Sequence, residues 1–187
     1  MTRIYFVRHS KPDFSIKDDL NRPLCEEGIR ACKKITEYLS DKRIHKVYSS
    51  PFKRAVDTIK DFADRFEFEI EKVEDLRERK VADIWIEDFN EFAKKQWEDF
   101  NYKLSNGENL NEVQTRNINV IHKILKSNAD KNIVIGTHGT ALSTIINYYD
   151  KSFDYSVFSR IKNLMLFIVF IDFEGLNAIN IQEVIIK

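Results

Sequence analysis

The chain has 187 residues, 43% of them hydrophobic, which predicts one domain with a single sizeable core. Lys and Arg together number 30, Asp and Glu together also number 30, and the formal net charge is +0. This balance gives no global field that would favour nucleic acid or an anionic membrane, so we expect neither as a partner. Any site for an anion must therefore be local.

The two cysteines and the apolar runs bear on the cellular compartment. Cys25 and Cys32 are seven residues apart, two turns along one face of a predicted helix. That separation is too long for a disulfide and is not a metal-binding pattern, which indicates a reducing, cytoplasmic location. The run 4–7 is too short for a signal peptide, and the stretch 164–171 falls far below the ~20 residues that span a bilayer. We therefore expect a soluble protein without a metal site.

Predicted strands and helices alternate along the first half of the chain. Residues 26–40 carry apolar side chains at helical spacing. Ser50-Pro51 is typical of an N-cap and a first helical residue, because proline lacks the amide that a first turn leaves unsatisfied. The expected elements are a strand at 3–7, a helix at 26–40, a strand at 46–49, a helix from Pro51 to about Arg65 and a strand at 68–73.

The second half begins with an aromatic-rich segment, in which Trp85, Phe89, Phe92, Trp97 and Phe100 favour a helix packed on the core over a cofactor-binding segment. Further on, an apolar run has the pattern of a central strand buried on both faces, and an alternating run has that of an outer strand. The expected elements are helices at 84–102, at 110–126 and after Gly139, and strands at 132–137, 164–171 and 179–186.

This alternation predicts an α/β fold. We expect one three-layer α/β/α domain over residues 1–187, with a mostly parallel central sheet and a C-terminal hairpin around the turn at Glu174-Gly175. The aromatic segment at about 84–110 is expected to be a helical insert that forms a wall or lid. No repeat, low-complexity tract or long linker divides the chain.

Two of the predicted strands end in a histidine. Arg8-His9 follows the strand at 3–7, His138-Gly139 follows the strand at 132–137, and Arg54 lies just inside a helix. Because ligands collect beyond the carboxyl ends of parallel strands, we expect these side chains to meet at one edge of the sheet. Two guanidinium groups match the oxygens of a phosphate dianion, and a neutral imidazole can attack phosphorus. The pattern favours phosphoryl transfer.

Six short motifs, in one order along nearly the whole chain, carry a resemblance to a known family. They are Arg8-His9-Ser10, Pro23-Leu24-Cys25-Glu26-Glu27-Gly28, residues 49–58, Leu76-Arg77-Glu78, Gly107-Glu108-Asn109 and Thr137-His138-Gly139. Their order and spacing resemble the histidine phosphatase superfamily, the phosphoglycerate mutase-like proteins. The resemblance implies that family's fold and a phosphatase that acts on a small phosphorylated metabolite without a metal ion or other cofactor.

The resemblance also implies roles for individual residues. His9 would form a covalent phosphohistidine while its other ring nitrogen donates to a backbone carbonyl. His138 would donate to the phosphate oxygens where charge develops, and Glu78 would protonate the leaving group and later activate water. The residues expected to bind the phosphate are Arg8, Arg54, Ser15, Arg22 and Gly139.

Departures from the family pattern bear on this hypothesis. Ser10 replaces a glycine, Ser15 stands where many members have an asparagine that contacts phosphate, and Cys25 replaces a helix-capping threonine. Arg22, placed before a Pro-Leu pair, resembles a smaller branch that includes bacterial phosphohistidine-protein phosphatases and tends to lack the acid. Whether Glu78 is the acid therefore bears on the substrate class.

Several alternatives stay open at this point. Glu78 lies in the charge run 74–79, which a solvated surface also explains, and Asp75 or Asp83 is an alternative acid. Hydrolysis is favoured over a phosphoglycerate mutase reaction, because the chain lacks insertions that resemble a mutase's enclosure against water. A phosphohistidine-protein phosphatase and a non-catalytic phosphate-binding α/β module are further alternatives. A monomer and a dimer are both open.

Overall fold

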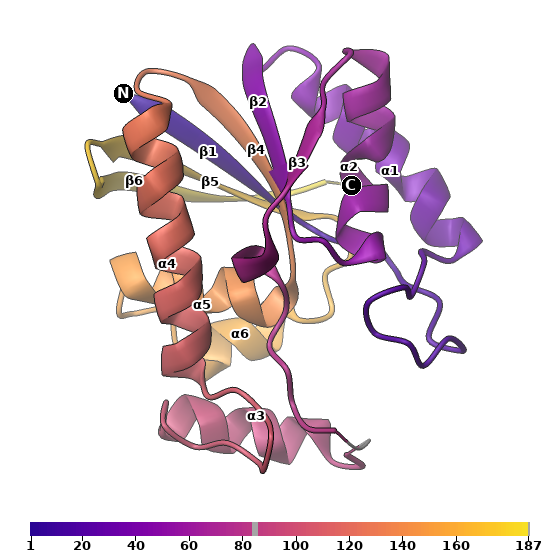
Figure 1. Ribbon diagram of the computed structural model, residues 1–187, viewed down its shortest axis with the longest axis vertical. Coiled ribbons are helices and arrows are strands. Elements are labelled where there is room, and N and C mark those ends of the chain that lie inside the picture. Colours follow the sequence, from indigo (N-terminus) through magenta and orange to yellow (C-terminus); the bar gives the residue numbers. More distant parts are fainter. Residues whose placement is uncertain (84–85, 187) are drawn as a thin grey trace.

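The computed structural model describes residues 1–83 and 86–186 and is built on one sheet with the strand order β3-β2-β4-β1-β5-β6 (Figure 1). β1 to β4 pair in parallel, whereas β5 pairs antiparallel with both β1 and β6. The strands are β1 (Thr2–Arg8), β2 (Ile44–Ser49), β3 (Ile70–Lys72), β4 (Asn132–Thr137), β5 (Phe167–Glu174) and β6 (Asn177–Ile185). The mostly parallel sheet and the C-terminal hairpin are confirmed.

Helices cover both faces of this sheet (Figure 1). One face carries α1 (Glu26–Leu39) and α2 (Lys53–Arg65), and the other carries α4 (Leu110–Ser127), α5 (Gly139–Tyr149) and α6 (Tyr155–Ile161). Each face buries its own apolar cluster between helices and strands, so the predicted three-layer α/β/α fold is confirmed. Within the described residues, we find no helix whose length and apolar character would allow it to cross a membrane.

The start of α1 packs closely against the loop that follows β1. A Cβ atom at Gly28 would lie 2.2 Å from the carbonyl oxygen of Lys11, so only glycine permits this approach. The Cys25 amide donates to the same carbonyl at 3.0 Å. Cys25 is the N-cap residue and makes no side-chain capping bond; it and Cys32 are free thiols. This contact holds the residues after β1 against α1.

The expected start of α2 was wrong. The helix begins at Lys53 with Phe52 as its N-cap, so Pro51 lies outside it. The Ser50 hydroxyl accepts a hydrogen bond from the Phe52 amide at 3.2 Å, which closes a turn before the helix rather than capping its first turn. Ser50 therefore has its side chain at the end of β2, where it can contact other strand ends.

Of the predicted strands only that at 132–137 has its exact bounds, and β3 and β5 illustrate the differences. β3 is shorter than the predicted 68–73 because only Ile70–Lys72 pairs with β2. β5 begins at Phe167 rather than Leu164, since the Leu164 amide closes a turn onto Ile161 at 2.9 Å. β5 is buried along most of its length as expected, but it lies beside the edge strand β6 and not at the centre of the sheet.

The aromatic segment forms a shorter helix than the predicted 84–102. Helix α3 spans Phe89–Glu98, and Ile84 and Trp85 lie outside the described residues. Trp97 packs on Phe153 and on Phe158 of α6, with ring centroids 6.0 and 5.5 Å away. The segment therefore packs against α6, below the sheet (Figure 1). Its role as a lid stays a prediction.

Candidate active site

The carboxyl ends of β1, β2 and β4 bring three polar segments together. In the parallel register Arg8 lies opposite Thr137, and the His9 amide donates to the Thr137 carbonyl at 2.9 Å. The Ser50 amide donates to the Gly136 carbonyl at 2.9 Å. The rings of His9 and His138 consequently meet edge to face with centroids 5.3 Å apart. The expectation that the two histidines share one edge of the sheet is confirmed.

His9 is held in a single tautomer. Its Nδ1 lies 2.8 Å from the Ser10 carbonyl oxygen, and a carbonyl can only accept, so Nδ1 carries the proton. Burial, and next the positive charge of Arg54, lower the pKa of His9 to about 3. The ring is therefore neutral near pH 7, and Nε2 has a free lone pair. These are the properties of a nitrogen nucleophile.

Ser10, at the position of the family's glycine, points away from the histidines. Its hydroxyl donates to the Gly28 carbonyl of α1 at 3.0 Å, and its amide donates to the Thr58 hydroxyl at 2.9 Å. Ser10 is fully buried, and its backbone φ angle is not positive, so its conformation does not require glycine. A side chain is tolerated here because α1 supplies an acceptor for it.

His138 is fully buried and is the N-cap residue of α5. Its Nε2 lies 2.7 Å from the Ser50 hydroxyl, whereas its Nδ1 is buried without a hydrogen-bond partner among the described residues. Burial, followed by the charge of Arg54, lowers the pKa of His138 well below its ordinary value. Sequence reasoning treated Ser50 only as a helix cap. The family motif at residues 49–58, which begins Ser49-Ser50-Pro51, was the available signal for its contact with the histidine.

Arg8 is largely occupied by backbone carbonyls. Its Nη1 donates to Ile161 and Leu164, at 2.8 and 2.6 Å, and its Nη2 donates to Lys162 at 2.6 Å. These bonds give partners to carbonyl groups at and just after the C-terminal end of α6. One N–H of Nη2 and the N–H of Nε remain; Nε is buried without a partner among the described residues, and a Cβ on Gly139 would lie 3.4 Å from it. In this arrangement Nη1 is fully used, which leaves Nε and the second N–H of Nη2 as the donors that a phosphate can meet.

Arg54 and Arg22 both bind Asp19, a residue that sequence reasoning missed. Nη1 of Arg54 donates to the Asp19 carbonyl at 2.6 Å and lies 3.1 Å from its carboxylate. Nη1 of Arg22 lies 3.0 Å from the same carboxylate oxygen. The Arg54 guanidinium also stacks on Phe52, whose ring contacts His138. Two cations therefore converge on one exposed carboxylate beside the histidines.

The carboxylate of Glu78 sits at the N-terminus of α5. It accepts hydrogen bonds from the amides of Thr140 and Ala141, each at 3.0 Å, and from that of Arg79 at 2.8 Å. A helix N-terminus favours such a negative charge. Since α5 begins directly after His138, these bonds place Glu78 beside the two histidines.

The two alternative acids lie in more exposed surroundings. The carboxylate of Asp75 pairs with Arg77, and that of Asp83 pairs with Lys80 and with the side-chain amide of Asn106. Both carboxylates are more than half exposed. Neither accepts a hydrogen bond from the start of α5 in the described residues. Glu78 is therefore the better-placed candidate.

A pocket of about 860 Å³ opens over this edge of the sheet. Its lining includes Asp19, Arg22, Arg54, Glu78 and Thr140 from the groups described above, but neither of the two buried histidines. Its rim includes Phe14, Ile86 and Phe89. Ser15 does not line it; the Ser15 hydroxyl donates to the exposed carboxylate of Asp13 at 2.7 Å. In this arrangement Ser15 is not brought to the candidate site.

Arg79 is a further pocket residue that sequence reasoning missed. Its guanidinium donates to the Gln96 side chain and lies over the rings of Phe89 and Phe92. Its Nε is buried without a partner among the described residues, and burial lowers the pKa of Arg79 to about 10. Among the lining residues, Arg79 is therefore a buried cation as Arg54 is.

The sequence matches a known family. The model of the histidine phosphatase superfamily (branch 1) matches residues 4–176. The chain belongs to this superfamily. In its described residues there is no group of three or more His, Cys, Asp or Glu side chains that could hold a metal ion.

Solved structures share this histidine phosphatase fold at low sequence identity. A phosphoserine phosphatase of Entamoeba histolytica, in complex with phosphoserine, has a TM-score of 0.79 and 19% identity, with 97% of this chain and 96% of that chain covered. Bacillus stearothermophilus YhfR has a TM-score of 0.77 and 20% identity over 95% and 94% of the two chains. A mycobacterial glucosyl-3-phosphoglycerate phosphatase has a TM-score of 0.76 and 18% identity over 98% and 97%. A comparison with curated proteins gives no match.

Proposed function

We propose that this protein is a phosphatase that hydrolyses a phosphomonoester through a phosphohistidine on His9, without a metal ion. The state of His9 carries the proposal. Its Nδ1 proton is committed to the Ser10 carbonyl and its ring is neutral, so the lone pair on Nε2 is free to attack phosphorus. Membership of the histidine phosphatase superfamily supports the same reaction class.

In the first step, Nε2 of His9 attacks phosphorus, and the bond between phosphorus and the ester oxygen breaks. The leaving oxygen takes a proton from Glu78. A bound phosphate dianion favours the protonated form of a neighbouring carboxyl group, because two like charges repel at short range. The place of Glu78 at the start of α5, directly after His138, brings its carboxyl group near the leaving oxygen.

The negative charge of the transferring group needs donors around it. Arg54 supplies its guanidinium once phosphate replaces the exposed Asp19 carboxylate. Nδ1 of His138 and Nε of Arg8 are buried donors without partners among the described residues, and we assign both to the phosphate oxygens. His138 serves in this way in the tautomer that carries its proton on Nδ1.

In the second step, water attacks the phosphorus of phosphohistidine. The bond from phosphorus to Nε2 of His9 breaks, Glu78 takes a proton from the water, and inorganic phosphate leaves. His9 regains its lone pair and Glu78 regains its proton. The cycle needs no further reactant.

We assign a small phosphorylated metabolite as the substrate. We also assign hydrolysis of the phosphohistidine, rather than return of the phosphoryl group to the dephosphorylated product. The similar structures include phosphatases named for phosphoserine and for glucosyl-3-phosphoglycerate. The rim residues Phe14 and Phe89 are 59% and 39% exposed, so water has access to the pocket. They also offer apolar surface to the organic part of a substrate.

The test is to trap the intermediate. The wild-type protein is incubated with 4-nitrophenyl phosphate, quenched in alkaline detergent and analysed by mass spectrometry, because phosphohistidine is stable to alkali and labile in acid. We expect a phosphate group on His9 and turnover of the substrate. The His9→Ala variant should lose both, whereas His122→Ala, on α4 and outside the site, should retain both.

Turnover that survives in the His9→Ala variant would remove His9 as the nucleophile. A wild-type protein with neither phosphoenzyme nor turnover across a broad panel of phosphoesters would favour a phosphate-binding module. Return of the phosphoryl group from labelled phosphoenzyme to an acceptor, in place of release to water, would favour a mutase.

A further inference from the structure

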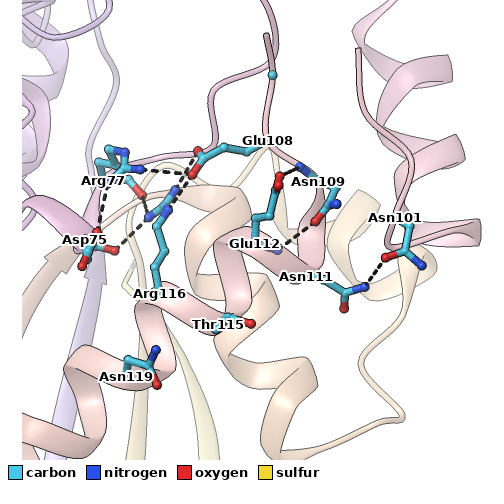
Figure 2. A pocket seen from close by; sticks show the side chains of 11 residues that line it. Asp75, Arg77, Asn101, Glu108, Asn109, Asn111, Glu112, Thr115, Arg116 and Asn119 are labelled. Atoms are coloured by element: carbon cyan, nitrogen blue, oxygen red, sulfur yellow. Dashed lines mark hydrogen bonds and ion pairs between the residues drawn. The ribbon is translucent and has the colours of Figure 1, made fainter. Parts of the chain in front are cut away.

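Arg116 of α4 uses every donor of its guanidinium on the backbone and side chains near Glu78. Its Nε and Nη2 donate to the two carboxylate oxygens of Glu108, at 2.8 and 3.0 Å. Its Nη1 donates to the carbonyls of Asp75 and Arg77, both at 2.8 Å, and Nη2 also donates to the Glu78 carbonyl at 3.2 Å. These five contacts match the five N–H groups of an arginine. Figure 2 shows Arg116 between Glu108 and the segment of Asp75 and Arg77.

Glu108 holds the backbone that follows Glu78. Its carboxylate accepts from the Lys80 amide at 2.9 Å, and its own amide donates to the Lys80 carbonyl at 2.8 Å. Burial alone would raise the pKa of Glu108, but the hydrogen bonds from Arg116 and Lys80 outweigh it and lower that pKa. Glu108 therefore stays an ionised acceptor for Arg116, for Lys80 and for Arg77, whose Nη2 lies 3.2 Å away.

Gly107 brings the two segments into contact. A Cβ atom at this position would lie 2.1 Å from the Val81 carbonyl oxygen, which no side chain could accommodate. The segment 77–81 has no helix or strand of its own, since the 3₁₀ turn before it ends at Leu76. Its backbone course is therefore set by the side chains that hold it.

The hollow beside these residues, of about 790 Å³, is not proposed as a ligand site, although Arg116 and Glu108 line it (Figure 2). Arg116 has no donor left for a ligand. Its nitrogen atoms instead hold three backbone carbonyls, those of Asp75, Arg77 and Glu78. The side chain of Glu78, at the end of the segment 75–78, reaches the start of α5.

We propose that Arg116 and Glu108 are positioning residues that hold the carboxyl group of Glu78 against the start of α5, where it delivers its proton to the leaving group. The proposal rests on the proposed function, because it requires Glu78 to be the acid. A lysine at position 116 retains the charge but has one nitrogen, which cannot reach three carbonyls and both Glu108 oxygens together.

The test compares two substrates of similar shape, 4-nitrophenyl phosphate and phenyl phosphate, whose leaving groups differ in their need for a proton. Misplacing the acid should reduce kcat/KM for phenyl phosphate about 10-fold more than for 4-nitrophenyl phosphate. We expect this selectivity in Arg116→Lys, in Glu108→Gln and, more strongly, in Glu78→Gln. Arg30→Lys makes the same exchange on the exposed surface of α1, where Arg30 pairs with Glu26, and should not change the ratio.

The double variant Glu78→Gln/Arg116→Lys separates the two proposals. With the acid already removed, the Arg116 exchange should add no further selectivity. If Glu78→Gln itself lowers kcat/KM equally for both substrates, the acid role of Glu78 fails. If Glu78→Gln is selective but Arg116→Lys and Glu108→Gln are not, the positioning role is overturned while the acid role stands. Thermal unfolding identifies a misfolded variant. If either Arg116→Lys or Glu108→Gln is misfolded, the substrate selectivity of the other variant decides the positioning role.

Discussion

One carboxylate oxygen of Asp19 lies 3.1 Å from Nη1 of Arg54, and the Asp19 main-chain carbonyl accepts a 2.6 Å hydrogen bond from the same nitrogen. The carboxylate thus occupies an arginine that we assign to the phosphate. The Asp19 side chain is 53% exposed, so water can take its place when phosphate displaces it. The main-chain bond does not depend on the side chain.

This relationship predicts tighter phosphate binding in Asp19→Asn. The amide carries no charge to compete with phosphate, and an exposed ion pair of about 0.2–1 kcal/mol corresponds to a gain of roughly 1.4- to 5-fold. The inhibition constant of inorganic phosphate measures it. Asp18→Asn, on the neighbouring carboxylate that accepts from Asn21, is the control. Weaker phosphate binding in Asp19→Asn would mean that its carboxylate orients Arg54.

Ser50→Ala is expected to slow turnover. The Ser50 hydroxyl is 2.7 Å from Nε2 of His138, and by donating there it keeps the His138 proton on Nδ1. Loss of this partner leaves a buried ring nitrogen unsatisfied, which costs about 1–3 kcal/mol and corresponds to roughly 5- to 150-fold in kcat/KM.

The adjacent serine is a matched control for that variant. Ser49 is also fully buried, but its hydroxyl has no hydrogen-bond partner among the described residues. Ser49→Ala should therefore leave kcat/KM for 4-nitrophenyl phosphate near the wild-type value. Equal losses in the two variants would show that the serines matter for packing only, and that the Ser50 contact does not orient His138.

The meeting of the two histidines was predictable because it follows from strand topology. Parallel neighbours end at the same edge, and each strand pattern ended directly at Arg8-His9 or at His138. The place of Glu78 was harder to predict, since a charge run looks alike whether one member is buried or not. What selects Glu78 is a pair of amides at the start of α5, more than 60 residues later in the chain.

The occupation of Arg8 and Arg54 could not be predicted from residue type. An arginine at a strand end suits a phosphate, but it suits the carbonyls at the end of α6 equally well. Which of them it binds depends on where residues 161–164 run, and no local pattern specifies that. The same holds for Asp19, which lies in an irregular loop between β1 and α1. Side-chain partners that depend on loop paths need the structure.

Arg3→Met is expected to destabilise the fold more than Asp172→Asn does. Arg3 and Asp172 are direct partners on β1 and β5, with Nε and Nη2 of Arg3 at 2.5 and 2.8 Å from the two carboxylate oxygens. The side chain of Asp172 is 5% exposed and that of Arg3 is 30% exposed. A charge left alone at Asp172 is therefore buried, whereas one left at Arg3 reaches water.

We expect Arg3→Met to reduce the free energy of unfolding by about 3 kcal/mol, and Asp172→Asn to reduce it by about 1 kcal/mol. The asparagine can still accept from Arg3 and pack in the same space. Urea unfolding of both variants at neutral pH measures the two values. Equal losses would contradict the asymmetry in burial, and no loss in Arg3→Met would mean that Asn180, the other partner of Asp172, is sufficient.

The buried histidines predict a loss of stability in mild acid. His9 has a folded-state pKa of about 3, set mainly by burial, against an ordinary value of 6.5 in the unfolded chain. Below pH 6.5 the unfolded chain binds a proton at His9 that the folded protein does not bind. The free energy of unfolding must then fall as the pH falls from 6.5 towards 3, by at most about 1.4 kcal/mol per pH unit. His138 acts in the same direction.

His9→Gln removes this proton-binding difference, so its unfolding free energy should depend less steeply on pH than that of the wild type. Urea unfolding at about pH 7, 6 and 5 measures the slopes above the range in which most carboxylates titrate. His122→Gln is the control, because His122 is only partly buried on α4 and its pKa is lowered without full desolvation. Equal slopes in wild type and His9→Gln would mean that folded His9 takes up a proton near pH 6, and would contradict a neutral nucleophile held by burial.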